Sequence, residues 1–426
     1  MESLVVGTLA LFGMVAGRLP IVDNSTFVHL RTGIEIARGH GIPRVDPYSF
    51  TASGHHWVVQ SWLPSWTYGV LAHHLGLGWV ALEQGVLVAA VAWLVARLAR
   101  TGSAVRTVAA AGIAVGAGAA YWAPRPLLFG LLAFVLTITV VERRANPLWL
   151  VPVVWFWVNS HGSFPLGGLW LGAAAVGDAL DRRARPLGSA RYIGAFLLGM
   201  LVAAVNPLGP RLLWFPFAVG DRRNVFRSVV EWQSPDFQSR AGIFTLVFVV
   251  LGLVVLLRRR VPWRDVLPVV VFLAIGLLAM RNLASMAVVF APALGRALRV
   301  DADATTARPL PLNTVIAGLL TVVFVMLGVS AAAGPGIRTT VYPVAATTWL
   351  DRHGYVGGAR RVATQDAVGC YLILRYGTRA HVFIDDRVDM YPVPVSEDYA
   401  TLLKGKPGAR RVLDRRGVDA VLWQRD

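Results

Sequence analysis

The sequence of 426 residues contains a single cysteine, Cys370, and only two lysines, Lys404 and Lys406. One cysteine excludes a disulfide bond within the chain and a metal cage built from several cysteines. Charged residues are also scarce, at 15% of the chain against 55% hydrophobic residues. The composition of residues 1–330 is therefore typical of a polytopic membrane protein and excludes a soluble globule.

Arginine supplies almost all of the positive charge, and the formal net charge is +17. In a soluble protein this excess would indicate a nucleic-acid partner, but here the arginines fall in short clusters between apolar runs. Membrane topology explains them better, so we predict the lipid bilayer as a partner and no nucleic acid. The preference for arginine over lysine, with abundant Ala, Val and Gly, indicates a GC-rich bacterial genome.

About eleven apolar runs are long enough to cross a hydrocarbon core, some with local thinning. The first lacks a basic segment before it and a cleavage site before Arg18, so we predict an uncleaved span and no signal peptide. Residues 62–76 are short, contain a proline and end in two histidines, which predicts a helix in the membrane interface. The predicted spans are 2–18, 78–97, 105–122, 126–142, 147–160, 164–180, 191–205, 242–257, 265–280, 282–298 and 311–332.

The arginine clusters indicate the orientation, because cytoplasmic loops hold the excess of basic residues. With a cytoplasmic N-terminus, a transmembrane domain (1–333) has its first loop (19–77) and a second segment (206–241) outside, and the last domain (334–426) is outside too. We therefore predict a multi-pass protein of the bacterial plasma membrane. The predicted inner clusters are Arg97/Arg100/Arg106, Arg143/Arg144, Arg182/Arg183/Arg185/Arg191, Arg258/Arg259/Arg260/Arg264 and Arg296/Arg299/Arg308.

The extracytoplasmic C-terminal domain has strands that alternate with helices, which predicts a small α/β layer with parallel strands. No glycine-rich phosphate loop follows any of these strands, so a nucleotide site is not indicated. The predicted helices are 343–353, 367–377, 396–404 and 408–415, and the predicted strands lie in RRVATQ (360–365), HVFID (381–385) and VDAVLW (418–423).

Polar residues gather at the predicted outer ends of the spans, on the side of Asp23. Ionisable groups at membrane depth are costly and usually face a cavity or a partner, so these residues are functional candidates. An arginine at a helix end also reaches headgroups without any further role. The set comprises Arg125, Asn159, His161, Asn206, Glu231 and Arg281.

Asp23 follows the first span immediately, and its carboxylate would serve as a general base or bind a divalent cation such as Mg²⁺ or Mn²⁺. The alternative is that Asp23 caps a short helix. His29 and Arg31 are near enough in sequence to share a site with it. Glu231 is the predicted second carboxylate, and its alternative is a surface salt bridge with Arg222, Arg223 or Arg227.

Three further motifs receive structural interpretations or open alternatives. DPYS (46–49) is typical of a turn and predicts scaffold. The histidines have no companion ligand at metal spacing, so zinc is not predicted; they are His55, His56, His73 and His74. The cluster Asp385, Asp386, Arg387 and Asp389 either binds a partner or glycan, or forms a solvated loop held by internal ion pairs.

With these features on one side, the chain resembles the GT-C superfamily of membrane glycosyltransferases, which use polyprenyl-phosphate sugars. The resemblance covers nearly the whole chain and is greatest to a bacterial group of generally unassigned substrates. The motifs that carry it are Asp23, HLRTG (29–33), P-x-x-DPYSFT (43–51), Trp57, Trp62-Leu63, Arg125-Pro126, N-x-HG (159–162), NP-x-G (206–209), EW (231–232), Arg281-Asn282 and D-x-R-x-D-x-Y (385–391).

The resemblance implies an inverting-type transfer of a hexose or pentose from a polyprenyl-phosphate donor to a cell-envelope glycan, lipid or protein. Asp23 would be the base or the acid beside a metal, and no cofactor is otherwise implied. Many GT-C enzymes have two near-adjacent acids in this loop, whereas Asn24 follows Asp23 here and the next acid is Glu35. From the charges, we predict Arg31, Arg125 and Arg281 as phosphate partners, with His29, Asn159 and His161 in substrate binding.

Two other classes of function remain open. A transporter or lipid flippase would have charged residues or broken helices near mid-membrane and a repeat relating two halves, and no such repeat is present. A non-catalytic envelope-assembly scaffold would keep the architecture and use the outer domain to bind a partner.

Overall fold

The computed structural model describes residues 1–181, 186–220, 229–300 and 311–424, and it is mostly helical. The chain forms two compact units. Unit 1 comprises Met1–Leu19, Ala81–Val205 and Val230–Ala333, and unit 2 comprises Pro20–Val80, Asn206–Val229 and Gly334–Asp426. The segment predicted as the first outer loop thus belongs to the same unit as the C-terminal segment, and the segment predicted as the second outer one is divided at Val230.

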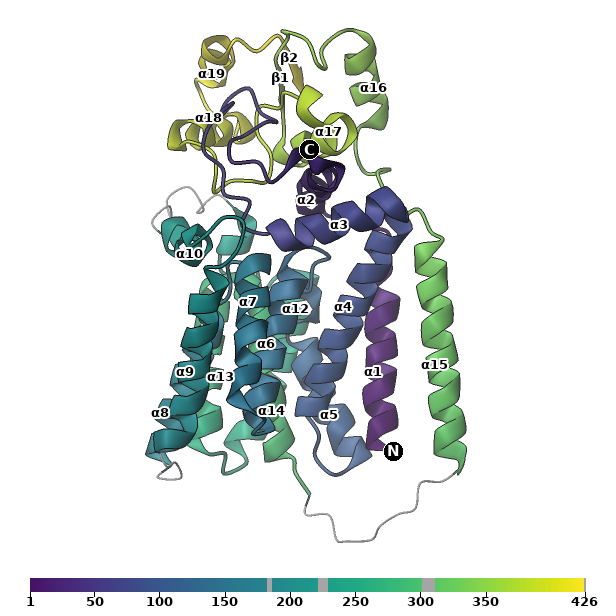
Figure 1. Ribbon diagram of the computed structural model, residues 1–426, viewed down its shortest axis with the longest axis vertical. Coiled ribbons are helices and arrows are strands. Elements are labelled where there is room, and N and C mark those ends of the chain that lie inside the picture. The colour runs from purple at the N-terminus through teal and green to yellow at the C-terminus, as the bar shows by residue number, and fades with distance from the viewer. Residues whose placement is uncertain (182–185, 221–228, 301–310, 425–426) are drawn as a thin grey trace. The chain divides into compact units, whose positions relative to one another are not determined.

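Unit 1 consists of helices that lie side by side (Figure 1). Its α-helices are α1 (Glu2–Gly17), α4 (Leu77–Leu98, from Ala81 on), α5 (Ala104–Gly116), α6 (Leu127–Glu142), α7 (Leu150–Ser160), α8 (Pro165–Leu180), α9 (Pro186–Ala203), α12 (Arg240–Leu257), α13 (Trp263–Leu278), α14 (Leu283–Ala297) and α15 (Pro311–Ala332). Single 3₁₀ turns occur at η2 (Ala119–Tyr121), η3 (Pro147–Trp149), η4 (Val230–Trp232) and η5 (Met280–Asn282).

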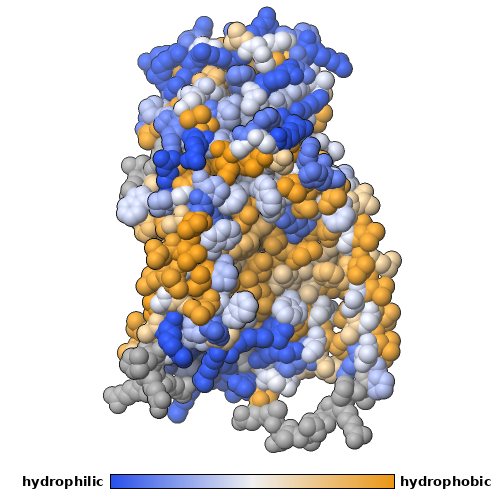
Figure 2. Space-filling view, in the orientation of Figure 1, coloured by the Kyte–Doolittle hydropathy of each residue, from blue (hydrophilic) through white to orange (hydrophobic). Residues whose placement is uncertain are grey.

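Each predicted apolar run coincides with one of these helices. Among the described residues, four helices are long and apolar enough to cross a membrane: Leu77–Leu98, Ala104–Tyr121, Arg240–Leu257 and Pro311–Ala332. Shorter apolar helices are Glu2–Gly17, Leu127–Glu142, Pro147–Ser160 and Gly188–Ala203. On the face shown in Figure 2 hydrophobic side chains predominate over the middle of unit 1, and hydrophilic ones gather at the end where the N-terminus lies.

That hydrophilic end of unit 1 contains a network of ion pairs between helix ends. Arg264 at the start of α13 pairs with Glu142 of α6 and with Asp178 of α8, at 3.2 and 2.6 Å. Arg296 near the end of α14 pairs with Glu142 and with Asp265. The sequence predicted these two arginines only as loop charges, whereas they connect four helices. Of the predicted inner arginines, Arg182, Arg183, Arg185 and Arg308 lie outside the described residues.

Unit 2 is built from three separate stretches of the chain. Its helices are α2 (Asn24–Glu35), the π-helical turn η1 (Ile36–His40), α3 (Trp62–His74), α10 (Arg211–Gly220), α16 (Val344–Arg352), α17 (Asp366–Tyr376), η6 (Gly377–Arg379), α18 (Val393–Leu403) and α19 (Ala409–Arg416). Strands β1 (Val362–Thr364) and β2 (Ala420–Leu422) pair in parallel, with Ala363 opposite Val421. The four C-terminal helices, two of the three predicted strands and their parallel pairing are confirmed.

The third predicted strand, HVFID, is wrong as a strand. Val382 forms only isolated bridges, to Val362 and to Ser49. Its N–H donates to the carbonyl of Tyr48 at 3.0 Å, and its carbonyl accepts from Phe50 N–H at 3.1 Å. Because Val382 forms only single-residue bridges, one of them to Val362 of β1, this segment is not a strand of the β1–β2 sheet.

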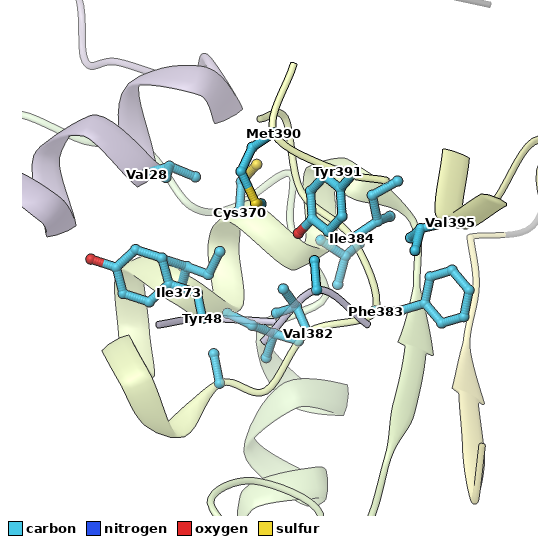
Figure 3. Packing of buried hydrophobic residues seen from close by; sticks show 14 of the residues in the cluster. Val28, Tyr48, Cys370, Ile373, Val382, Phe383, Ile384, Met390, Tyr391 and Val395 are labelled. Carbon is cyan, nitrogen blue, oxygen red and sulfur yellow. The ribbon is translucent and has the colours of Figure 1, made fainter. Parts of the chain in front are cut away.

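One hydrophobic core joins the first outer loop to the C-terminal segment (Figure 3). From the loop, Phe27, Tyr48 and Trp57 are at most 5% exposed. From the C-terminal segment, Phe383 and Tyr391 are completely buried in the same cluster. Burial of apolar area is the main source of folding free energy, so these two stretches stabilise each other.

The helix predicted at 62–76 forms as α3, which crosses α2 at very close range. A Cβ atom placed on Gly33 would lie 1.7 Å from the carbonyl oxygen of Ser65, and one on Gly69 would lie 2.0 Å from the Gly33 carbonyl. Only glycine permits two backbones to approach in this way. Residues 62–74 are thus helical as predicted, and α3 packs against α2 within unit 2.

Candidate functional site

Asp23 is the N-cap of α2, as the alternative interpretation of the sequence predicted. Its carboxylate accepts a hydrogen bond from Ser25 N–H at 3.0 Å, and its backbone is extended, as expected for a cap. The C-terminal segment fixes the chain just before it: Ile21 N–H donates to the Gly336 carbonyl at 2.8 Å, and the Tyr342 hydroxyl donates to the Val22 carbonyl at 2.8 Å. The position of Asp23 therefore depends on residues more than 300 positions later.

Tyr342 has the electrostatic environment expected beside this carboxylate. Burial raises the pKa of its phenol most, and the negative charges of Asp23 and Asp386 raise it further. Its ring stacks on Tyr371, with centroids 5.2 Å apart. Tyr342 thus remains protonated over the physiological range and keeps its hydroxyl proton for the Val22 carbonyl.

His29 and Arg31 do not lie on the same side of α2. The His29 Nδ1 atom is 3.0 Å from the Ser65 hydroxyl on α3. Arg31 pairs with Glu35 at 2.6 Å and lies against Gly377, where a Cβ atom would be 2.3 Å from its Nη2. Residues two positions apart on a helix point about 200° apart. The structure therefore does not bring these two predicted ligands together.

In unit 1 the structure brings three predicted site residues into one cluster. Arg125, just before α6, forms an ion pair with Glu231 of η4. Arg281 of η5 lies over the Trp232 ring, 4.4 Å from its centroid, and is within electrostatic range of both Glu231 and Arg125. η4 and η5 are joined by a hydrogen bond of 2.9 Å from Met280 N–H to the Gln233 carbonyl. Glu231 thus pairs with Arg125, and the Arg281 guanidinium lies close enough to feel both charges.

Asn159 and His161 are at the end of α7, in the same unit. The Asn159 amide donates to the Trp155 carbonyl at 2.7 Å and is completely buried. His161 Nδ1 is 2.8 Å from the Ser163 hydroxyl and accepts from Ser163 N–H at 3.2 Å. Since Nδ1 is an acceptor, the neutral ring carries its proton on Nε2.

His161 packs against α6, the helix that begins just after Arg125. A Cβ atom on Gly130 would lie 3.0 Å from the His161 Cβ. Gly130 is five residues after Arg125, less than about two helical turns away. We therefore treat the cluster of Arg125, Glu231, Arg281 and Trp232, with His161 nearby, as the candidate site of unit 1.

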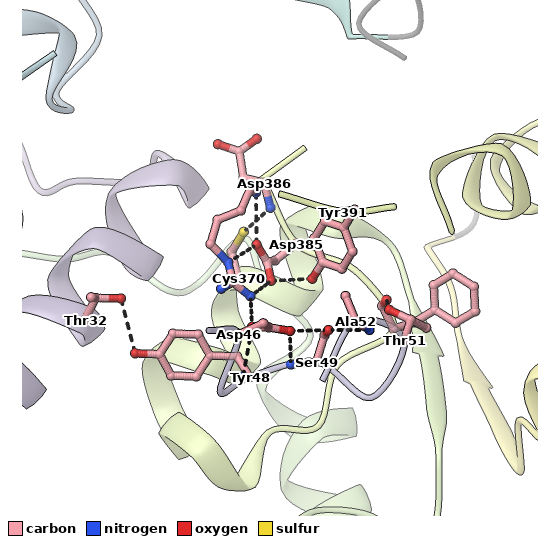
Figure 4. Close-up of polar contacts among 12 residues, drawn as sticks. Thr32, Asp46, Tyr48, Ser49, Thr51, Ala52, Cys370, Asp385, Asp386 and Tyr391 are labelled. Atoms are coloured by element: carbon pink, nitrogen blue, oxygen red, sulfur yellow. Dashed lines mark hydrogen bonds and ion pairs between the residues drawn. The ribbon is translucent and has the colours of Figure 1, made fainter. Parts of the chain in front are cut away.

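The third group of predicted residues, around Arg387, forms a buried ion-pair cluster with Asp46 and Asp385 in unit 2 (Figure 4). Arg387 Nη2 is 2.7 Å from Asp46 and 2.6 Å from Asp385, and its guanidinium lies over Trp57, 4.4 Å from the ring centroid. Tyr391 donates to Asp385 at 2.6 Å. With 7% of Arg387 exposed and Asp385 fully buried, this part of the motif is not a solvated loop.

Asp46 belongs to the DPYS turn and confirms its scaffold role. Its carboxylate accepts from Tyr48 N–H and Ser49 N–H, both at 3.1 Å, as well as from Arg387. Burial by itself would raise the pKa of Asp385, but the Arg387 guanidinium and its hydrogen bonds lower that pKa below its ordinary value. The ion pair expected inside this motif is present, and it reaches the first loop.

Trp232, Ser163 and Tyr342 were not predicted as site residues. Trp232 directly follows Glu231, and a tryptophan at this position could have been predicted as a partner of a cation from its aromatic ring. The position of Tyr342 beside Asp23 had no signal in local sequence. Within the described parts of the chain, no group of three or more His, Cys, Asp or Glu side chains is arranged to hold a metal ion.

No known protein-family model matches the chain, and no curated protein is significantly similar to it.

Proposed function

We propose that the chain is a multi-pass protein of the bacterial plasma membrane with all of unit 2 on the extracytoplasmic side. The assembly of unit 2 from three separate stretches of the chain supports this topology independently of the arginine clusters. Since its three stretches fold together, they share one side of the membrane, and the chain must cross an even number of times between Val80 and Asn206 and again between Val229 and Gly334. Six and four predicted spans fall in these intervals.

We further propose that the protein transfers a sugar from a polyprenyl-phosphate donor to an acceptor of the cell envelope. The observation that carries this proposal is the cluster in which Arg125 pairs with Glu231 and Arg281 lies within electrostatic range of both. Two cations against one carboxylate leave an excess positive charge, which suits a phosphate group. The cluster adjoins the ends of apolar helices, where a lipid-linked phosphate would enter.

In this mechanism a carboxylate takes the proton of an acceptor hydroxyl, whose oxygen attacks the anomeric carbon of the donor sugar; the sequence predicts Asp23 for this role. The bond between that carbon and the phosphate oxygen breaks, and the electron pair leaves with the polyprenyl phosphate. Arg125 and Arg281 stabilise the charge that develops on the leaving oxygen, which lowers the barrier. Arg31 pairs with Glu35 in unit 2, and we assign the phosphate role to the two arginines of unit 1 because they lie at the ends of apolar helices.

The test is transfer of label from a polyprenyl-phosphate sugar in proteoliposomes, for the wild type, Asp23→Asn and Arg281→Gln. Asparagine also caps helices well, so Asp23→Asn removes the base and keeps the local fold. We expect wild-type transfer and a loss of at least about 100-fold in Asp23→Asn, as for removal of a general base. Equal turnover of both proteins would remove Asp23 from the mechanism.

The same proteoliposomes separate the transferase from its rivals. Movement of the donor lipid between leaflets without any sugar transfer would replace the proposal with a flippase. Absence of both activities, with cross-linking of unit 2 to an envelope partner that persists in Asp23→Asn, would favour a scaffold. The Asp385–Arg387 pair is buried within unit 2, which disfavours the use of that pair as a partner-binding surface.

A further inference from the structure

The surface of α19 and the turn before it carries a concentration of positive charge. Between residues 404 and 416 there are six cations and one carboxylate, Asp414, and both lysines of the chain are among the cations. Lys404, Lys406, Arg410 and Arg411 are all exposed. We call these four residues the basic patch.

Local hydrogen bonds hold the basic patch together. Lys406 N–H donates to the Thr401 carbonyl at 3.1 Å, and Ala409 N–H donates to the Lys406 carbonyl at 3.0 Å, so the turn leads directly into α19. Gly405 and Gly408 have φ angles of 54° and 108°, which few other residues adopt without strain. The two lysines and the first two arginines of α19 therefore lie in one short segment, the turn and the first turn of the helix that follows it.

The patch differs from the other arginines of α19 in its lack of counterions. Arg415 and Arg416 both pair with Asp398 of α18. Within the stretches that the structure describes, Lys404, Lys406, Arg410 and Arg411 form no ion pair. α19 has no acidic residue in its first turn, where negative charge is favoured, so the repulsion among these cations is not offset locally.

We propose that the basic patch binds a polyanionic glycan of the cell envelope, a polymer that carries phosphate or carboxylate groups. Charge complementarity indicates an anionic partner, and the spread of four cations along the turn and helix suits a chain of charges better than a single ion. That the polymer comes from the envelope rests on the proposed outer location of unit 2. The patch itself does not depend on the proposed transfer reaction.

The apolar side of α19 disfavours a lipid surface as the occupant. Helices that lie in a bilayer place their apolar face in the lipid. Val412, on the apolar side of α19, is 6% exposed and belongs to the core of unit 2. In Figure 2 hydrophilic side chains predominate over the end of unit 2 that carries α19. The patch therefore presents charge without an inserting face.

The test uses the full-length protein in phosphatidylcholine nanodiscs and fluorescently labelled poly(glycerol phosphate), polygalacturonate and neutral dextran. The patch variant is Lys404→Gln/Arg410→Gln/Arg411→Gln. Its matched control removes three exposed arginines of the same unit elsewhere, Arg338→Gln/Arg352→Gln/Arg375→Gln. Protection of the buried thiol of Cys370 from a maleimide verifies that both variants remain folded.

We expect anisotropy titrations to show binding of one or both charged polymers and none of dextran. The patch variant should bind about tenfold more weakly, from three exposed charge contacts of roughly 0.5 kcal/mol each, and the control should match the wild type. Salt of about 0.15 M should weaken binding, since the Debye length is then only about 8 Å.

Several results would overturn the inference. These are equal weakening in the folded control variant, unchanged affinity in the patch variant, binding of dextran, or capture by phosphatidylglycerol vesicles but by neither polymer. Preference for single-stranded DNA over both polymers would assign the patch to nucleic acid. If the polymers bind at the patch while proteoliposomes transfer no sugar, the inference stands and the transferase proposal fails.

Discussion

Replacement of Arg387 by methionine tests whether the C-terminal segment and the first outer loop fold as one body. The change removes the guanidinium that Asp46 and Asp385 share and leaves both carboxylates buried. Loss of one partner from a buried ion pair costs about 3–5 kcal/mol. Since 1.36 kcal/mol is a factor of ten, the equilibrium for opening unit 2 should rise by roughly 10²–10⁴.

Cys370 provides the assay without further engineering. It is the only cysteine, it is fully buried in the core of unit 2, and burial raises the pKa of its thiol well above the ordinary value. The thiolate is the reactive form, so labelling reports opening of the unit. We expect the labelling rate in Arg387→Met to rise by roughly 10²–10⁴, or until opening is complete.

The control is Arg375→Met, which removes an exposed arginine of α17 whose Nη1 donates to the Tyr371 hydroxyl at 3.2 Å. Its labelling rate should change by less than about fivefold, as for other surface contacts. If Arg387→Met is labelled no faster than Arg375→Met, the ion pairs of Arg387 with Asp46 and Asp385 do not stabilise unit 2.

The stability lost in Arg387→Met should depend on pH. The folded-state pKa of Asp385 is lowered, so its contribution to stability is present above the unfolded pKa of about 3.9 and is lost as pH falls through the folded value. In Arg387→Met the buried carboxylate loses its counterion, so its ionised form destabilises the fold, and protonation of the variant relieves that cost as pH falls while the wild type keeps its contribution down to about pH 3.9. The difference in stability between wild type and variant should therefore shrink as pH falls from 7 toward 4. A constant difference would contradict the ion pair.

Three further predictions concern the candidate residues and the packing around them. Asp23→Ala should cost about 1 kcal/mol of helix-cap stability, whereas Asp23→Asn should retain the Cys370 labelling rate of the wild type; equal destabilisation by both would exclude the cap. Gly33→Ala should prevent the α2–α3 crossing and leave Cys370 unprotected in the purified protein, because the added Cβ would lie 1.7 Å from a carbonyl oxygen; normal protection would show that the helices can separate. Glu231→Gln should bind polyprenyl phosphate up to about fivefold more tightly, since it releases Arg125 from a partly exposed ion pair; weaker binding would mean that Glu231 itself contacts the lipid phosphate.

The helices could be predicted from the sequence because length and apolarity alone define them. All eleven predicted runs fall on helices, and Asp23 was identified as a possible cap from its position before the NST segment. The C-terminal helices and strands β1 and β2 followed from local periodicity in the same way. These features depend on residues close together in the chain.

Contacts between distant residues could not be predicted. Arg387 pairs with Asp46, more than 300 residues earlier, and no local pattern relates them. HVFID has the composition of a strand, yet its backbone hydrogen bonds go to Tyr48 and Phe50 of the first loop. The predicted alternative for Glu231, a salt bridge with Arg222, Arg223 or Arg227, lies outside the described residues. Among the described residues Glu231 pairs with Arg125, about 100 positions earlier, and no local pattern indicated this pair.

The most direct test is the sidedness of the three stretches of unit 2. Single cysteines replace the exposed residues His55, Pro210 and Lys404, one in each stretch of unit 2. A fourth variant replaces Arg259, which is predicted on the opposite side of the membrane. Intact cells that express each variant are treated with a membrane-impermeant maleimide. Cys370 is buried and provides the unlabelled background. We expect the first three positions to be labelled from outside and position 259 only after permeabilisation. Labelling of any one of the three only after permeabilisation would contradict a single outer unit.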